Sequence, residues 1–114
     1  MISADGVRAI IAQYEKFGWR LRRVLVTEEL REYLGNEISG HFRNADVVDS
    51  DLDAAWFSRP SRGAGVAWEV RMLDDLPFAL VEVVDVDDDD ALEGVLLRLE
   101  NDLRSRHDKR SSRA

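Results

Sequence analysis

The residues best suited to chemistry lie on predicted strands in the second half of the chain, where charged and aromatic side chains alternate with aliphatic ones. Two carboxylates held together in a half-buried setting can share a proton or hold a cation, which is how paired acids become a general acid and base. A nearby guanidinium and aromatic rings would add recognition of a ligand. The candidate partner- or ligand-binding residues are Trp56, Glu69, Arg71, Phe78, Leu80 and Glu82.

The position of these residues depends on how two consecutive strands align. A turn that sets Leu73 opposite Phe78 also sets Glu69 opposite Glu82. Like charges at such a position are unfavourable unless a group such as Arg71 compensates them, so a structural ion-pair network is the competing interpretation. A shift of one residue removes the pairing. In this register the predicted core face carries Val66, Trp68, Val70 and Met72 on one strand and Ala79, Val81 and Val83 on the next.

The opposite face would carry the six candidate residues, together with Ala67, Leu73 and Val84. A sheet face that only meets water is more polar than this one, and contiguous exposed apolar patches tend to mark interaction surfaces. Two other interpretations remain open at this stage. The short second helix and the segment 36–53 would cover the face, or a second copy of the chain would.

The sequence lacks the usual signatures of catalysis and metal binding. No glycine-rich phosphate loop precedes a helix, and neither His41 nor His107 has a helical partner at i+4 for a zinc site. The acidic runs 49–53 and 85–90 lack the glycine and glutamate that a calcium loop needs at its sixth and twelfth positions. We therefore expect no catalytic residue, no metal and no cofactor.

Composition and charge indicate a single small globular domain. The 114 residues are 45% hydrophobic and 34% charged, and they include no cysteine. No apolar run approaches the roughly 18 residues that span a bilayer, and the N-terminus lacks a signal-peptide pattern, so we expect a cytoplasmic protein without membrane contact. The net charge is −7, with a basic segment at 104–114. Nucleic-acid binding is therefore not expected, except weakly through that segment.

Hydrophobic periodicity predicts an α+β fold. We expect a two-layer sandwich, in which N- and C-terminal amphipathic helices pack on one face of an antiparallel sheet of four or five strands. The last three strands would form a meander. The domain would span 1–103, followed by a disordered tail at 104–114. The predicted helices are 3–17, a short one after Thr27 and one after the run 85–90; the predicted strands are 19–26, a brief one at 47–48, 54–59, 66–73 and 78–84.

Two hypotheses for function follow. The first is a non-enzymatic protein–protein interaction module that forms a homodimer, or binds a protein partner, through the second sheet face. The alternative is a small-molecule binding protein or enzyme with a pocket lined by Trp56, Glu69, Arg71 and Glu82. The first is favoured because catalytic signatures are lacking and the second face is apolar.

Overall fold

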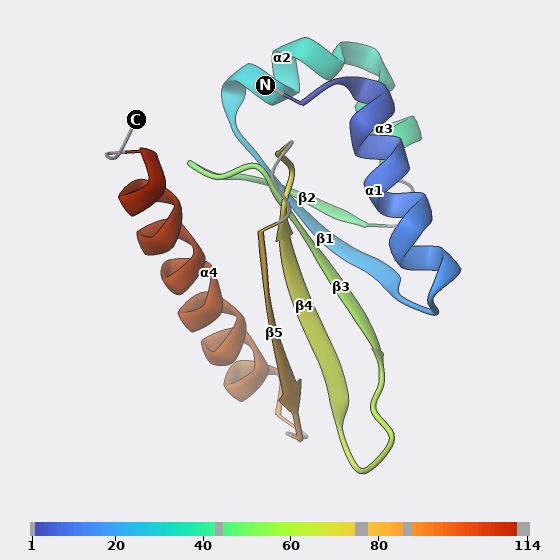
Figure 1. The fold of residues 1–114 in the computed structure, drawn as a ribbon, viewed down its shortest axis with the longest axis vertical. Coiled ribbons are helices and arrows are strands. Elements are labelled where there is room, and N and C mark those ends of the chain that lie inside the picture. Colours follow the sequence, from blue (N-terminus) through green and yellow to red (C-terminus); the bar gives the residue numbers. More distant parts are fainter. Residues whose placement is uncertain (1, 43–44, 75–77, 86–87, 112–114) are drawn as a thin grey trace.

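A computed structural model describes residues 2–42, 45–74, 78–85 and 88–111. The chain forms one sheet with helices before, within and after it (Figure 1). The α+β class and the strands expected from the sequence are confirmed. In chain order the elements are α1 (Ala4–Lys16), β1 (Arg20–Val26), α2 (Glu28–Leu34), a 3₁₀ turn η1 (Gly35–Glu37), α3 (Ile38–His41), β2 (Asp46–Asp49), β3 (Ala54–Pro60), β4 (Val66–Met72), β5 (Ala79–Val84) and α4 (Asp89–Ser111).

The sheet is mixed, which corrects the expectation of a purely antiparallel one. Its strand order is β2-β1-β3-β4-β5, and β1 pairs with β2 in parallel while the other neighbours are antiparallel. A parallel pair needs a crossover connection, and α2, η1 and α3 provide it. The C-terminal three strands form the predicted meander.

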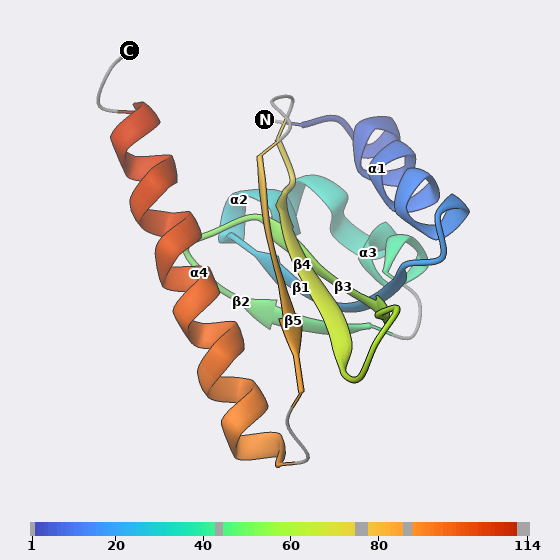
Figure 2. The same ribbon diagram turned by 60° about the horizontal axis from the view of Figure 1, so that its bottom comes forward.

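Helices cover both faces of the sheet, so the expected two-layer packing on one face is wrong. On one face, α1 and α2 pack with β1 and β3 in a cluster that includes Val7, Leu30 and Phe57. On the other face, α4 packs on a cluster that includes Trp56 and Trp68. Figure 2 shows α4 and α1 on opposite sides of the strands. Strand β3 is buried on both faces from Ala54 to Ser58, which explains why it lies at the centre.

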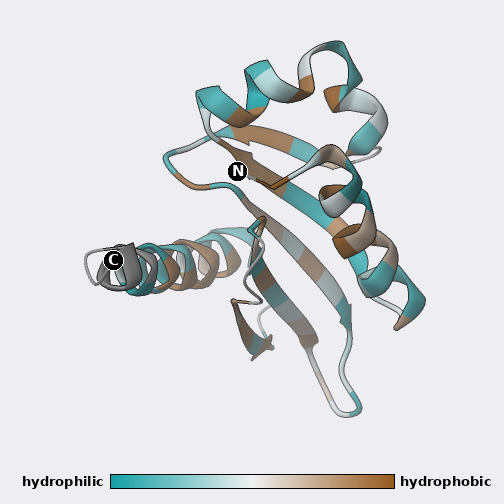
Figure 3. Ribbon diagram, turned by 45° about the horizontal axis from the view of Figure 1, so that its top comes forward, coloured by the Kyte–Doolittle hydropathy of each residue, from teal (hydrophilic) through white to brown (hydrophobic). Residues whose placement is uncertain are grey.

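Capping residues set the beginnings of the first two helices. The Ser3 hydroxyl accepts from the Gly6 amide, and the Thr27 hydroxyl accepts from the Leu30 amide. Apolar residues recur along α1 and α4, as Figure 3 shows. Gly18 follows Phe17, the C-cap of α1, and takes a positive φ of 86°, where a left-handed residue turns the chain toward β1.

The register of β4 and β5 differs by one residue from the expected one. Met72 pairs with Phe78, because the Met72 amide donates to the Phe78 carbonyl at 2.8 Å. Glu69 therefore lies opposite Val81, and Glu82 lies opposite Trp68. The connection is one residue longer than the turn assumed from the sequence, and a slip of one residue moves every side chain of β5 to the other face.

Helix α4 continues to Ser111 and so includes most of the segment that was expected to be a disordered tail. Arg104 in that segment binds both carboxylate oxygens of Asp51 through Nε and Nη2, at 2.8 to 3.0 Å. This contact holds the C-terminal half of α4 to the loop before β3. Residues 112–114 lie outside the described residues.

Candidate functional site

Four of the six predicted site residues lie under α4. Trp56 is fully buried, and its indole N–H donates to Glu100 on α4 at 2.7 Å. Phe78 and Leu80 pack against the same cluster, and Glu82 pairs with Arg98 of α4 at 2.5 Å. The face predicted to meet a partner is therefore covered by a helix of the same chain.

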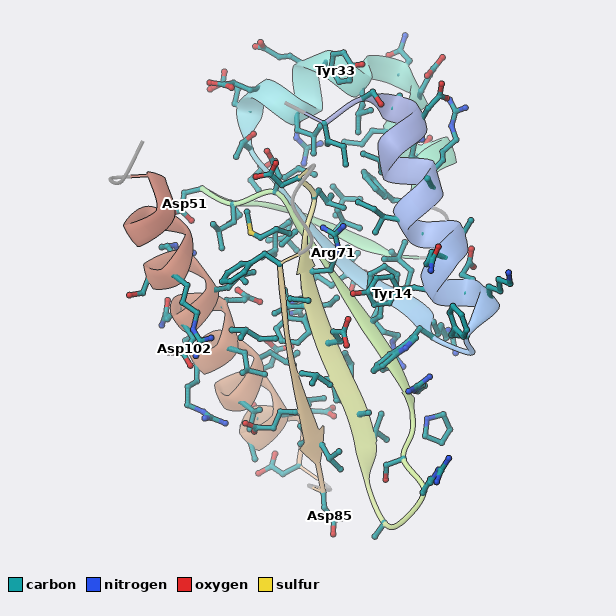
Figure 4. The ribbon with its side chains drawn as sticks, viewed as in Figure 1. Tyr14, Tyr33, Asp51, Arg71, Asp85 and Asp102 are labelled. Carbon is teal, nitrogen blue, oxygen red and sulfur yellow. The ribbon has the colours of Figure 1, made fainter. Side chains whose placement is uncertain are left out.

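The other two predicted site residues, Glu69 and Arg71, lie on the face that carries α1. Both are half-buried. Tyr14 points from α1 toward β4, donates its hydroxyl to Glu69, and lies near Arg71 over the sheet (Figure 4). Because the sheet separates these residues from Trp56 and Glu82, the four residues of the predicted ligand pocket do not line one cavity. The predicted pair of Glu69 and Glu82 is wrong for the same reason.

Aromatic rings hold the Tyr14 hydroxyl in place. The Tyr14 ring stacks on Phe57 with centroids 4.1 Å apart and meets Trp19 edge to face at 6.1 Å. Burial of the phenol and its hydrogen bond to Glu69 raise the pKa of Tyr14 above its ordinary value. Arg59 stacks over Trp19 at 4.3 Å and donates to the carbonyl of Phe17, the C-cap residue of α1, at 2.8 Å. These contacts form an ordered polar cluster that fixes the C-terminal end of α1 to the sheet.

On the sheet face that carries α1, the helices of the described part of the chain pack with β1 and β3, and none of them lies over β5 (Figure 1). We call the surface of Ala79, Val81 and Val83 the open half-face. Val81 and Val83 are 57% and 55% exposed, although they are aliphatic residues in the middle of a strand. The charged residue of that stretch, Glu82, points to the other side. An edge strand of a monomeric protein commonly carries a lysine or a proline on such a surface, and β5 carries neither.

The backbone of the same three residues faces the free edge of the sheet. In an antiparallel ladder, residues alternate between those bonded to the neighbour and those pointing away. Met72 bonds to Phe78, so the even-numbered residues of β5 face β4. The N–H and C=O groups of Ala79, Val81 and Val83 therefore point outward. The open half-face therefore coincides with the edge of the sheet that no other described strand pairs with.

A cavity of about 600 Å³ lies between α1 and the crossover segment η1–α3. His41 lines it with a side chain that is only 3% exposed. The His41 Nδ1 atom accepts from Arg8 Nε at 3.4 Å, and Nε2 has no hydrogen-bond partner within the described ranges. No local pattern in the sequence indicates this contact, because Arg8 and His41 are 33 residues apart along the chain. The polar lining residues are Arg8, Glu15, Asn36, Glu37, Ser39 and His41.

No group of three or more His, Cys, Asp or Glu side chains in the described part of the chain is arranged to hold a metal ion. Within those same residues, no helix combines the length and apolar character needed to cross a membrane.

No protein-family model matches the chain, and no curated protein or solved structure resembles it at a significant level. The α+β fold and the two surfaces described above are therefore the basis for any assignment of function.

Proposed function

We propose that the protein is a non-enzymatic interaction module that self-associates through the open half-face and the free edge of β5. The observation that carries the proposal is the coincidence of two exposed valines with a backbone edge on which no strand of the described part of the chain pairs. The outward N–H and C=O groups of an edge strand are a template for another strand, and apolar side chains beside them favour the association. The interface lies on the opposite sheet face from the one expected, since α4 covers Trp56, Phe78 and Leu80.

A two-fold axis at Val81 gives the pairing that fits this strand. Two copies of β5 then run antiparallel, with Val81 opposite Val81 of the second copy and Ala79 opposite Val83. All three residues have outward backbone groups, so each becomes part of a hydrogen-bonded pair. The apolar side chains of both copies meet on one face. This arrangement is isologous, because the same patch is used on both copies.

Light scattering after size-exclusion chromatography tests the proposal over a range of concentrations. The wild-type chain is expected to have the mass of a dimer at the higher concentrations, and Val81→Lys is expected to give a monomer. Lysine adds positive charge to an acidic chain, so loss of the dimer would not result from increased overall repulsion.

Val48→Lys is the matched control, because Val48 is a 41% exposed valine on the other edge strand, β2. This variant is expected to remain dimeric. Circular dichroism of both variants checks that the fold is retained. A wild-type monomer at all concentrations would contradict the proposal, and so would equal effects of the two substitutions.

A further inference from the structure

We propose that the cavity between α1 and η1–α3 binds a free α-amino acid with an apolar side chain. The cavity of about 600 Å³ is large enough for such a ligand, and Arg8, whose side chain is 59% exposed, is one of the residues that line it. It is separate from the open half-face, so this inference does not depend on self-association. Its lining combines a cation, two carboxylates, a buried imidazole and an apolar floor.

The tautomer of His41 follows from its contact with Arg8. A guanidinium has only donors, so Nδ1 must accept with a lone pair, and the proton of the neutral ring is on Nε2. That N–H group is buried and lacks a partner in the described part of the structure. Glu37 Oε2 is 3.6 Å away, too far for a hydrogen bond. A buried donor without a partner is costly, and an oxygen of a ligand would satisfy it.

The charges around this donor select a zwitterion. Arg8 and the Nε2 proton of His41 would receive the carboxylate of the ligand, while Glu37 and Glu15 would pair with its ammonium group. A simple anion would meet the two carboxylates, which oppose it. Ile11 and Leu21 lie in the same cavity and would contact an aliphatic side chain. The pattern of one cation, one neutral donor and two acids around an apolar floor therefore fits an amino acid.

A divalent metal is the competing occupant, since His41 and Glu37 are four residues apart on one helical turn. A metal at Nε2 requires the lone pair there, and the other nitrogen of a metal-bound histidine usually donates its proton to an acceptor. Arg8 at Nδ1 is a donor, which imposes the opposite tautomer. The contact between Arg8 and His41 therefore disfavours a metal.

The test is titration of the full chain with L-leucine, followed by NMR of the backbone amides. We expect saturable shifts in α1 and in the crossover segment at up to about 10 mM ligand. Leucinamide lacks the carboxylate and N-acetyl-leucine lacks the ammonium group, and each is expected to bind at least about tenfold more weakly. Equal binding of either analogue, no saturable shift with leucine, or saturation by Zn²⁺ instead would overturn the proposal.

Substitutions locate the site. Arg8→Gln and Glu37→Gln are each expected to weaken leucine binding by about tenfold. Arg20→Gln is the control, because Arg20 is exposed and lies outside the cavity, and this variant is expected to leave leucine binding unchanged. His41→Gln can retain an N–H donor near the Nε2 position, so it should bind better than His41→Leu. Glu37 is 72% exposed, so its variant is expected to fold even if the His41 variants do not. Unchanged binding in Arg8→Gln and Glu37→Gln would refute the site.

Discussion

Replacing Tyr14 by phenylalanine removes one hydroxyl and leaves the stacking on Phe57 in place. The hydroxyl donates to Glu69, and a hydrogen bond to a charged group contributes about 1.5 to 3 kcal/mol. Tyr14 and Glu69 are both half-buried, so water replaces part of the lost contact. We therefore expect the free energy of unfolding to fall by about 1 to 2 kcal/mol. With an unfolding entropy of about 2.1 cal/mol/K per residue, the 114-residue chain would lose about 4 to 8 °C in Tm.

Thermal unfolding followed by circular dichroism measures this change. Tyr33→Phe is the control, because Tyr33 on α2 is 53% exposed, and its expected effect is within about 0.5 kcal/mol.

The dependence of stability on alkaline pH gives a second readout. The pKa of Tyr14 is raised in the folded state above the ordinary tyrosine value of 10.0. The contribution of the Tyr14 hydroxyl to the free energy of unfolding is therefore complete below pH 10.0 and is lost as the pH rises above it. Tyr14→Phe should therefore weaken the alkaline decline in stability. Equal effects of the two tyrosine variants would refute the reasoning.

Two further predictions concern the connections between elements. Gly65→Ala should destabilise the fold by about 2 kcal/mol or more, because Gly65 has φ +94° and an added Cβ would lie 2.7 Å from the Val84 carbonyl oxygen. Urea unfolding measures this loss. Gly63→Ala is the control and should change urea unfolding little, because an added Cβ at Gly63 would lie in open space. The hydrogen bond from Arg23 lowers the pKa of Glu93, so its contribution is present above the ordinary value of 4.5 and lost as the pH falls. Glu93→Gln should lower the free energy of unfolding by about 0.5 kcal/mol at neutral pH, and it should reduce the fall in stability at acid pH. Urea titrations at several pH values would measure both effects, and an unchanged fall at acid pH would contradict the prediction.

The elements were predictable because their local signals are strong. The apolar stripe of α1, with Ser3 as its cap, indicated the helix without knowledge of its surroundings. The arrangement of the layers was harder to predict from the sequence than the elements were, since it depends on which sheet face each helix covers. One signal in the sequence favoured two covered faces. The run Ala54, Ala55, Trp56 and Phe57 is apolar without alternation, which is typical of a strand buried on both sides.

The candidate site was predicted less well, because it depended on one register. The turn after β4 permits Phe78 to face either Leu73 or Met72, and only tertiary packing decides between them. The choice of Leu73 moved Val81 and Val83 into the predicted core, although both are exposed. The His41 cavity is formed by segments distant in sequence, so no local pattern indicated it. His41→Leu and Val81→Lys therefore test features that only the structure revealed.

Cross-linking through a single cysteine is the most direct test of self-association. The chain has no cysteine, so Val81→Cys introduces its only thiol, and a short bis-maleimide can then join only two copies of this residue. A two-fold axis at Val81 places the two thiols a few ångströms apart, and we predict rapid formation of a covalent dimer. Val48→Cys, on the opposite edge strand, should remain largely uncross-linked. Cross-linking of Val81→Cys no faster than that of Val48→Cys would contradict pairing through β5.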